Sequence, residues 1–329
     1  HVVTANKALI AKYGDQLAEI AEKNRVNLEF EASVCGGVPI IRSIKEGLIA
    51  NRIQKIYGIF NGTSNYILSS MDKDNKNFLD VLYKAKTLGY AETNPASDLN
   101  GDDVAAKLKI LSSLCFNSYL NNNIHVEGIK NIDKEDIDNA NKLGYKIKLL
   151  GYSELINNNI FQRVHPTLIK TSSYVAGIDG VLNAVIIDGS PVGQSIIQGE
   201  GAGPTATTSA LVSDISSILR GNIKFPFSIS NKKRKKLQFK NISGRFFSAY
   251  LRFEVADKSG VLSNITNIFS KSKVSIKRLI QNPNKKKGTS SIIIVTHASK
   301  DKYYTKIVNQ IDKKNYIIKK SKLIRIDDN

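Results

Sequence analysis

The chain has 329 residues, which is long enough for two or three domains that each bury a hydrophobic core. Hydrophobic residues make up 41% and charged residues 23%, as in ordinary globular proteins, and no apolar run reaches the roughly 18 residues of a membrane span. The formal charge of +19 is scattered along the chain instead of gathered in one patch, so we expect no nucleic-acid partner. We expect a cytoplasmic protein that does not bind membranes.

The cysteines and the first residue set further limits. Cys35 and Cys115 stand far apart, without Cys-x-x-Cys or Cys/His spacing, which argues against a disulfide framework and a zinc site. The chain starts at His1, enters a strand-like run at once and shows no signal peptide. We therefore expect a piece of a longer protein.

Helix and strand patterns alternate near the start of the chain. Residues 8–24 carry one apolar stripe at helical spacing, with Thr4 or Asn6 as the N-cap, and residues 27–34 alternate as a strand. Strand, helix and strand in this order favour the last unit of a doubly wound α/β sheet. Three further elements are predicted: a helix from Pro39 to about Gly47, a strand over residues 53–60 and a helix over residues 78–88.

The segment from Asn61 to Tyr66 combines a tight turn with a helix start. Its backbone N–H groups suit a carboxylate or a phosphate. They suit a plain strand-to-helix turn equally well, so both interpretations stay open.

Residues 89–109 place acidic side chains and a lysine around one turn. Asp102 is predicted to cap a helix, on which Asp103 and Lys107, four residues apart, share one face. As an exposed ion pair the two would contribute only about 0.3–0.5 kcal/mol. The stretch that follows is apolar on almost every side, so we expect the pair at the edge of a buried region. This favours a catalytic lysine over a structural salt bridge.

The region after this helix is rich in short strands. Residues 125–150 hold a strand, a short helix and an amphipathic stretch. A glycine-rich turn at 199–205 then leads into a helix over 206–219. Such a turn lets a phosphate or a cofactor approach the backbone, but it serves close packing equally well. The strands predicted before it cover residues 161–164, 174–175, 181–187 and 192–197.

The basic segment NKKRKKLQFK at 231–240 has no apolar period, which favours a solvated linker over a nucleic-acid or localisation tract. The elements beyond it follow the order strand, helix, strand, strand, helix, strand, which is typical of a small ferredoxin-like domain that folds separately. They cover residues 249–256, 260–270, 274–281, 290–296, 303–309 and 316–326.

Five segments of the chain together match a known family: VVTANK at 2–7, EASVCGGVPII at 31–41, NGTSNYIL at 61–68, GYAETNPASDLNGDDVAAKL at 89–108 and GEGAGPTATTSALVSDI at 199–215. With these segments in this order, the chain as a whole resembles homoserine dehydrogenase. The resemblance implies reduction of L-aspartate 4-semialdehyde to L-homoserine with NADH or NADPH, in threonine and methionine biosynthesis. The family's GxGxxG-type loop for the cofactor pyrophosphate is then expected before His1.

The C-terminal segment YLRFEVADKSGVLSNITNIF at 250–269 resembles an ACT regulatory domain, which implies an amino-acid effector. Ser259 departs from the family pattern, because a proline often precedes the glycine of this turn.

The resemblance to homoserine dehydrogenase implies roles for five charged residues. Lys107 matches the proton donor, and Lys7 matches a second cation close to cofactor and substrate. Glu92 and Asp103 match the carboxylates that hold the amino-acid substrate, with Asp98 as a helper nearby.

It also implies a cofactor site and a cation site. Gly89 and Gly201 match positions near the nicotinamide of NAD or NADP. A structural sodium or similar cation is held, in the family, by residues that match Glu31 and the backbone carbonyls of Val34, Gly36 and Val38.

The chemistry agrees with these roles. Reduction of an aldehyde needs a hydride at carbon and a proton at oxygen, and a lysine ammonium stabilises the developing alkoxide and then supplies the proton. An isolated lysine, with a pKa of about 10.4, holds its proton tightly at neutral pH. Burial and the charge of Lys7 are expected to lower the pKa of Lys107, while Asp103 opposes this and keeps the amine aimed.

We therefore predict an α/β chain that forms homo-oligomers, as the resemblance implies. The alternative hypothesis is a non-catalytic amino-acid sensor, which needs no set of Glu92, Asp103 and Lys107. The predicted parts are the end of a Rossmann-type nucleotide-binding domain at 1–35 with 199–220 packing back on it, a mixed-sheet α+β catalytic and dimerisation domain at 36–198, a basic linker at 221–247 and a ferredoxin-like βαββαβ ACT domain at 248–329.

Overall fold

The computed structural model describes residues 1–120, 123–284 and 287–327 and divides into two compact units. Each unit is defined by the contacts within it and not by the role of its segments, so the domain boundaries that the sequence predicts remain a prediction. Among the described helices, none is both long and apolar enough to cross a lipid bilayer. Unit 1 comprises His1–Lys134, Lys148–His165 and Gly177–Asn241, and unit 2 comprises Glu135–Ile147, Pro166–Ala176 and Ile242–Asn329.

Unit 1 starts with a small parallel β-α-β arrangement, in which β1 (Val2–Val3) pairs with β2 (Leu28–Glu29) and α1 (Lys7–Lys23) connects them. Of the two predicted caps for α1, Asn6 is the one used, because its side chain accepts the Leu9 N–H at 3.0 Å. This agrees with the predicted end of a doubly wound sheet.

The strand predicted over residues 27–34 is shorter than expected, because the chain turns into η1 (Glu31–Ser33) after β2. The Glu31 carboxylate accepts the backbone N–H groups of Ile41 and Arg42 at 2.8 and 2.7 Å, which caps α2 (Ile40–Arg42). The turn brings the side chain to that helix end, so this contact with a later segment replaces strand pairing. A π-helical turn, η2 (Ser43–Gly47), continues α2 to the predicted end.

The main sheet of unit 1 has the order β6-β5-β3-β7-β8. β3 runs antiparallel to both β5 and β7, and β8 runs antiparallel to β7. The strands are β3 (Arg52–Ile59), β5 (Tyr145–Ile156), β6 (Asn159–Lys170), β7 (Leu182–Ser190) and β8 (Gly193–Glu200). The short strands β4 (His125–Val126) and β9 (Gln238–Phe239) pair with β6.

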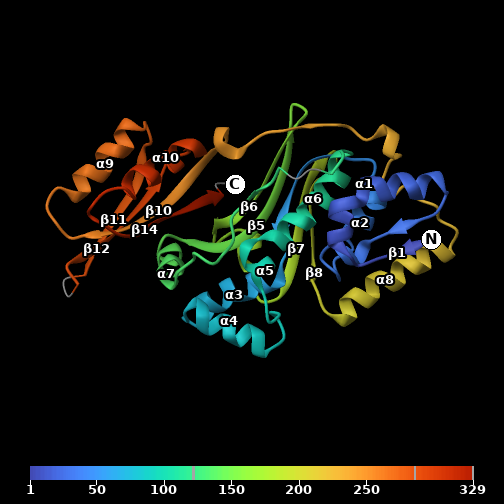
Figure 1. Ribbon diagram of the computed structural model, residues 1–329, viewed down its shortest axis with the longest axis horizontal. Coiled ribbons are helices and arrows are strands. Elements are labelled where there is room, and N and C mark those ends of the chain that lie inside the picture. Colours follow the sequence, from blue (N-terminus) through green and yellow to red (C-terminus); the bar gives the residue numbers. More distant parts are fainter. Residues whose placement is uncertain (121–122, 285–286, 328–329) are drawn as a thin grey trace. The chain divides into compact units, whose positions relative to one another are not determined.

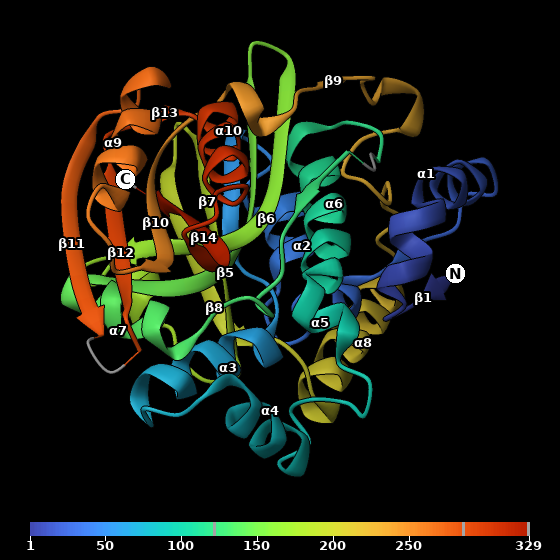
Figure 2. The same ribbon diagram turned by 60° about the vertical axis from the view of Figure 1, so that its left-hand side comes forward.

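The helices of unit 1 pack around this sheet. α6 (Asp102–Phe116) packs against β3 and against α1, beside which it lies in Figure 2. α8 (Pro204–Leu219) contacts η1, where Asp214 accepts the Glu31 N–H at 3.0 Å. The remaining helices are α3 (Gly62–Lys73), α4 (Phe78–Thr87) and α5 (Ala96–Asn100).

The basic segment 231–240 differs from the expected solvated linker. It opens with η4 (Asn231–Lys233), and the next residue, Arg234, is only 5% exposed. The Arg234 guanidinium donates to the Ser118 carbonyl and forms an ion pair with Asp15 at 2.7 Å. Charge alone therefore did not distinguish this arginine from the exposed lysines beside it.

Unit 2 contains the predicted ferredoxin-like domain, with the strand order β11-β12-β10-β14 followed by the last residues of β6. The helices α9 and α10 lie together over one face of this sheet (Figure 1). Leu251 and Phe253 of β10 pack there against Ile265 and Tyr304 in one core. The elements are β10 (Phe246–Ala256), α9 (Val261–Lys271), β11 (Ile276–Asn284), β12 (Thr289–Thr296), β13 (Ser299–Lys300), α10 (Asp301–Ile311) and β14 (Ile317–Asp327).

Residues 250 and 252 of β10 point away from that core and contact α7 (Lys134–Lys142). Arg252 pairs with the fully buried Asp136 at 2.6 Å and with Glu135 at 2.7 Å.

The strand predicted at residues 174–175 is wrong. That segment forms the 3-10 turn η3 (Tyr174–Gly177), closed by the Ala176 N–H on the Ser173 carbonyl.

Candidate active site

The first turn of α6 carries the acid and the lysine singled out in the sequence. Gly101, with φ 89°, is the N-cap, and Asp102 is the first helical residue, so the predicted cap is wrong by one position. A side chain at Gly101 would press on Val164, since an added Cβ would lie 3.1 Å from Val164 Cγ1. Asp103 and Lys107 lie one turn apart with Oδ2 and Nζ at 2.8 Å, and the two residues are only 5% and 8% exposed. The pair is therefore buried, as expected.

Asp103 is the centre of a larger polar cluster. Its second oxygen pairs with Lys7 Nζ at 3.0 Å, and the Lys7 side chain remains 42% exposed. Asn61 Nδ2 donates to Asp103 at 2.9 Å and to Asp98 at 2.7 Å. The Lys107 ammonium also donates to the Phe60 carbonyl oxygen at 2.7 Å. The fold thus brings Lys7, Asp98, Asp103 and Lys107 together from three segments of the chain.

Asn61 is a site residue that the sequence did not identify as one. Its Oδ1 accepts the Ser64 N–H at 2.7 Å and caps α3, which leaves its Nδ2 for the two carboxylates. The sequence predicted only that a helix begins near Asn61, whereas the structure shows that the capping side chain also bridges Asp98 and Asp103. These two residues lie 37 and 42 positions further along the chain, so no local sequence pattern indicates the contact.

The charges of the cluster stabilise one another. Burial alone would raise the pKa of Asp103, but Lys107 and then Lys7 outweigh it and bring the pKa to about 2. Burial likewise opposes the charge on Lys107, yet Asp103 prevails and the pKa of Lys107 is raised above its ordinary value. The expectation of a lowered pKa for this lysine is therefore wrong, because the Asp103 carboxylate at 2.8 Å outweighs the effect of burial. Lys107 is an ammonium at neutral pH.

Glu92 and Gly89 lie in the loop between α4 and α5. Glu92 is exposed, and within the described residues it forms no ion pair and no hydrogen bond. Gly89, with φ +74°, ends the turn after α4, and the Thr63 hydroxyl donates to the neighbouring Tyr90 carbonyl at 2.6 Å. The structure therefore does not join these two residues to the cluster around Asp103.

Gly201 lies against two buried side chains, Asn183 and, through it, Cys35. Cys35 is 1% exposed, and Lys107 and Asp103 both influence the pKa of its thiol, which burial raises to about 11. Asn183 donates to Cys35 Sγ at 3.6 Å, and its Oδ1 lies where a Cβ of Gly201 would stand. Neither side chain was identified as a site residue from the sequence, since Cys35 has no paired cysteine or histidine and Asn183 sits in an ordinary strand.

The residues expected to hold a cation lie at the start of η1 and in the turn that leads from η1 to α2. Glu31, Val34, Gly36 and Val38 are all buried. Both carboxylate oxygens of Glu31 accept backbone N–H groups, as described above. No cluster of three or more His, Cys, Asp or Glu side chains suited to a metal occurs in the parts of the chain that the structure describes.

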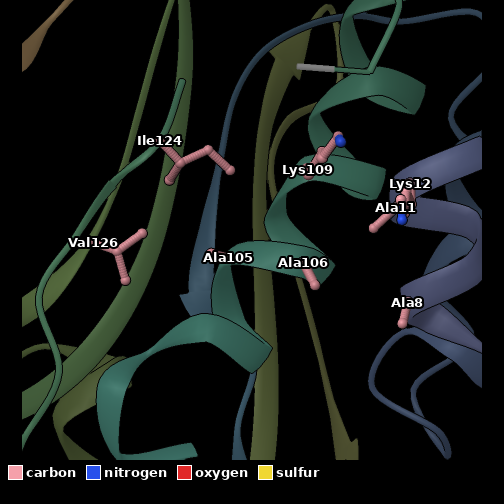
Figure 3. A pocket seen from close by; sticks show the side chains of 8 residues that line it. All are labelled: Ala8, Ala11, Lys12, Ala105, Ala106, Lys109, Ile124 and Val126. Carbon is pink, nitrogen blue, oxygen red and sulfur yellow. The ribbon is translucent and has the colours of Figure 1, made fainter. Parts of the chain in front are cut away.

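A cavity of about 360 Å³ lies beside the cluster, between α1 and α6. Ala8 and Ala11 of α1 and Ala106 of α6 project into the gap between these helices (Figure 3). Lys12 and Lys109 line it as well, whereas Asp103 and Lys107 do not. The cavity is thus adjacent to the polar cluster and separate from it.

Comparisons with known proteins agree with the geometry. A sequence model of homoserine dehydrogenase matches residues 39–216, more than half of the chain. The homoserine dehydrogenase of Neisseria gonorrhoeae is 40% identical over 99% of this chain, and 77% of that protein is covered. The chain belongs to the homoserine dehydrogenase family. Members of this family are NAD(P)-dependent oxidoreductases of amino-acid biosynthesis.

Other homoserine dehydrogenases are similar over the same range. The Helicobacter pylori protein is 38% identical over 99% of this chain and 77% of its own length. The crystal structure from Thiobacillus denitrificans is 38% identical, with a TM-score of 0.92 over 100% of this chain and 76% of that one. A hyperthermophilic archaeal homoserine dehydrogenase in complex with NADPH is 28% identical, with a TM-score of 0.59 over 68% of this chain and 65% of that one.

The C-terminal part matches a second family model, the AHAS small subunit-like ACT domain, over residues 251–319. The resemblances inferred from the sequence are thereby confirmed for both parts. A homoserine dehydrogenase that carries an ACT domain is favoured over a non-catalytic sensor, because the dehydrogenase match spans the buried acid–lysine pair.

Proposed function

We propose that Lys107 is the proton donor when this homoserine dehydrogenase reduces L-aspartate 4-semialdehyde to L-homoserine. This role is supported by the position of the Lys107 amine, which is buried and bound to the Asp103 carboxylate at 2.8 Å and to the Phe60 carbonyl oxygen at 2.7 Å. An ammonium has three N–H donors. The two protein partners leave one donor for the oxygen of the substrate.

Bound NADH or NADPH supplies a hydride to the aldehyde carbon. As negative charge grows on the aldehyde oxygen, Lys107 stabilises it in a site with little water and then transfers its proton to it. The raised pKa of Lys107 ensures that this proton is present at neutral pH. Asp103 remains ionised, with its pKa at about 2, and keeps the amine oriented.

The substrate also carries an ammonium group, and we place it against Asp98 and Glu92. Asp103 already holds two lysines and Asn61, so its oxygens are largely occupied. Asp98 accepts one hydrogen bond, from Asn61, and is half-buried, and Glu92 is exposed. In this arrangement Asp103 contributes a negative potential to substrate binding, and the other two carboxylates make the direct contacts.

For the cofactor, Lys7 and the turn at Gly201 are the residues that fit NADP or NAD. Lys7 presents a cation that is 42% exposed beside the buried ion pair, which suits a ligand that carries phosphates. Gly201 lets the backbone come close to a ligand, as glycine does at such turns. Gly89 has open space around its Cα, and we propose that it faces the nicotinamide.

A sodium ion at Glu31 and the carbonyls of Val34, Gly36 and Val38 is a further proposal. One carboxylate with neutral carbonyl oxygens is a hard, weakly charged donor set, which suits a monovalent cation. Replacing choline chloride by sodium chloride should then raise the melting temperature of the parent and not that of Glu31→Gln. Equal melting temperatures of the parent in both salts would contradict the site.

We also propose that the ACT domain binds an amino-acid effector. A cavity of about 350 Å³ opens at the turn between β10 and α9, lined by Asp257, Lys258, Ser259 and Gly260 among others. Calorimetric titration with L-threonine tests it, and no heat of binding for L-threonine or for other amino acids would contradict it. The family resemblance favours a homo-oligomer, which sedimentation velocity tests.

The central experiment replaces Lys107 in the complete protein. Lys107→Ala should lower kcat by about 10²-fold or more through loss of the acid, with the fold retained. Lys109→Ala, two residues further along the same helix and outside the polar cluster, is the control and should keep nearly full turnover. If Lys107→Ala kept the turnover of the parent, the assignment would be refuted.

A further inference from the structure

A buried amide on β7 has a polar atom without a hydrogen-bond partner. The Asn183 side chain is 0% exposed, and its Nδ2 donates to Cys35 Sγ at 3.6 Å. Its Oδ1 has no hydrogen-bond donor among the described residues. An unsatisfied buried carbonyl costs about 1–3 kcal/mol, so an amide in this position calls for an explanation.

The unpartnered oxygen lies against the glycine-rich turn. A Cβ added to Gly201 would stand 1.4 Å from Asn183 Oδ1, which no real contact allows. Gly201 is absent from the residues with positive φ, so glycine is needed here for space and not for its backbone angle. The oxygen occupies the space in which the side chain of any other residue at position 201 would begin, so only a hydrogen atom fits there. The amide thereby fixes how closely the turn approaches β7.

The same turn touches the segment that holds Cys35. Gly37 N–H donates to the Glu200 carbonyl at 2.9 Å, and a Cβ on Gly36 would lie 3.1 Å from the Gly201 carbonyl oxygen. The charge of Lys107 lowers the pKa of the Cys35 thiol, although burial outweighs it. Buried contacts thus join the glycine-rich turn to Asn183 and Cys35, and the charge of the Lys107 amine acts on that thiol.

We propose that Asn183 is a positioning residue for hydride transfer, which sets the place of the turn at Gly201 relative to Lys107. This rests on the proposed function, in which the nicotinamide lies at Gly201 and the proton donor is Lys107. Hydride donor, carbonyl carbon and proton donor must be aligned together, and a misplacement of about 1 Å can cost about 10²-fold in rate. Asn183 touches neither substrate nor cofactor and acts through the turn.

The test uses Asn183→Ala in the complete protein, with Gln194→Ala, an exposed amide on the neighbouring β8, as the matched control. We expect kcat to fall by about 10- to 100-fold, with the KM for the aldehyde changed by less than about twofold. The primary isotope effect with deuterated NADPH should rise, because hydride transfer becomes slower. The control should change neither quantity. A lower melting temperature with unchanged kcat and isotope effect would mean a purely structural role and overturn the proposal.

A second pair of variants tests the contact itself. Gly201→Ala should lower the melting temperature, because its Cβ overlaps Asn183 Oδ1, and the double variant Asn183→Ala/Gly201→Ala should regain it, because the shorter residue 183 makes room. The double variant should not regain kcat. If Gly201→Ala alone had the stability and activity of the parent, the proposal would be overturned. This outcome is decisive even if Asn183→Ala does not fold.

Lys107→Ala, measured in parallel, separates the two claims. If Lys107→Ala keeps its turnover, the proposed function fails whatever Asn183 does. If Lys107→Ala is inactive and Asn183→Ala has the kcat and isotope effect of the parent, only the positioning role fails.

Discussion

The replacement of Asp103 by asparagine removes a negative charge that lies between two lysine amines, 2.8 Å from Lys107 Nζ and 3.0 Å from Lys7 Nζ. The asparagine side chain has almost the same shape as that of aspartate, so the packing of α6 is kept. Only the negative charge is lost. Removing one partner of a buried ion pair costs about 3–5 kcal/mol, because the other charge stays buried and unpaired. Since Lys7 is 42% exposed and remains solvated, we expect the lower end, about 3 kcal/mol of unfolding free energy at pH 7.

The acid dependence of stability should change as well. The pKa of Asp103 is about 2 in the fold, below its ordinary value of 3.8. A carboxylate whose pKa is lower in the folded than in the unfolded chain stabilises the fold above its unfolded pKa, and this stabilisation is lost as the pH falls toward the folded pKa. A shift of this size corresponds to about 2 kcal/mol between pH 5 and pH 2. Asp103→Asn should lack this part of the pH dependence.

Urea unfolding followed by circular dichroism, at pH 7 and at steps from pH 5 downward, measures both effects. Asp102→Asn, an exposed acid at the same helix end, is the control and should stay within about 1 kcal/mol of the parent. If Asp103→Asn had the unfolding free energy and the acid dependence of the parent, the ion pairs would not stabilise this site, and the electrostatic argument would be refuted.

Three further predictions concern buried charges and thiols. Asp136→Ala removes the buried carboxylate that pairs with the Arg252 guanidinium and keeps only the pair with the half-exposed Glu135, so it should lose about 3–5 kcal/mol in urea unfolding. Glu135→Gln, which changes a 44% exposed side chain, should lose less than about 1 kcal/mol, and equal losses for the two variants would contradict this. Arg234→Met should lose about 3 kcal/mol by the same measurement, and a loss below 1 kcal/mol would show that the guanidinium is dispensable. Cys35 and Cys115 are buried with raised pKa values, so neither should react with Ellman's reagent at pH 7.5 until urea is added, and rapid native reaction would disprove their burial.

Local patterns located several elements but did not always identify their buried face. The apolar spacing over residues 8–24 predicted α1 to within a few residues, yet Leu9, Tyr13 and Ile20 are exposed, and the buried face is formed by smaller residues and Ile10. In the C-terminal part the patterns predicted β10, α9, β11, β12, α10 and β14 to within a few residues, without the short β13, and their order gave the ferredoxin-like domain. The spacing of Asp103 and Lys107 predicted their shared face, and the apolar residues after them predicted its burial.

Contacts between distant segments decided what the sequence could not show. The strand expected around Glu31 gives way to a turn, because the carboxylate caps α2 ten residues later. Arg234 looks like one cation of a basic run, and only the folded chain shows Asp15 beside it. Asn61 and Asn183 act on residues far away along the chain, so no local pattern marks them.

The sign of the pKa shift at Lys107 also depended on distance. The sequence led us to expect effects of burial, Lys7 and Asp103 on the pKa of Lys107, but the 2.8 Å separation between the amine and the Asp103 carboxylate decides that the pKa is raised. Composition and spacing do not contain that distance.

The position of the Lys107 amine relative to the substrate is the central claim, and a crystal structure of the complete protein with NADPH and L-homoserine measures it directly. We predict Lys107 Nζ within about 2.6–3.2 Å of the hydroxyl oxygen of L-homoserine, with Asp103 and the Phe60 carbonyl still bound to the amine. A hydroxyl oxygen that is held by another residue, with Lys107 out of hydrogen-bond reach, would contradict the account.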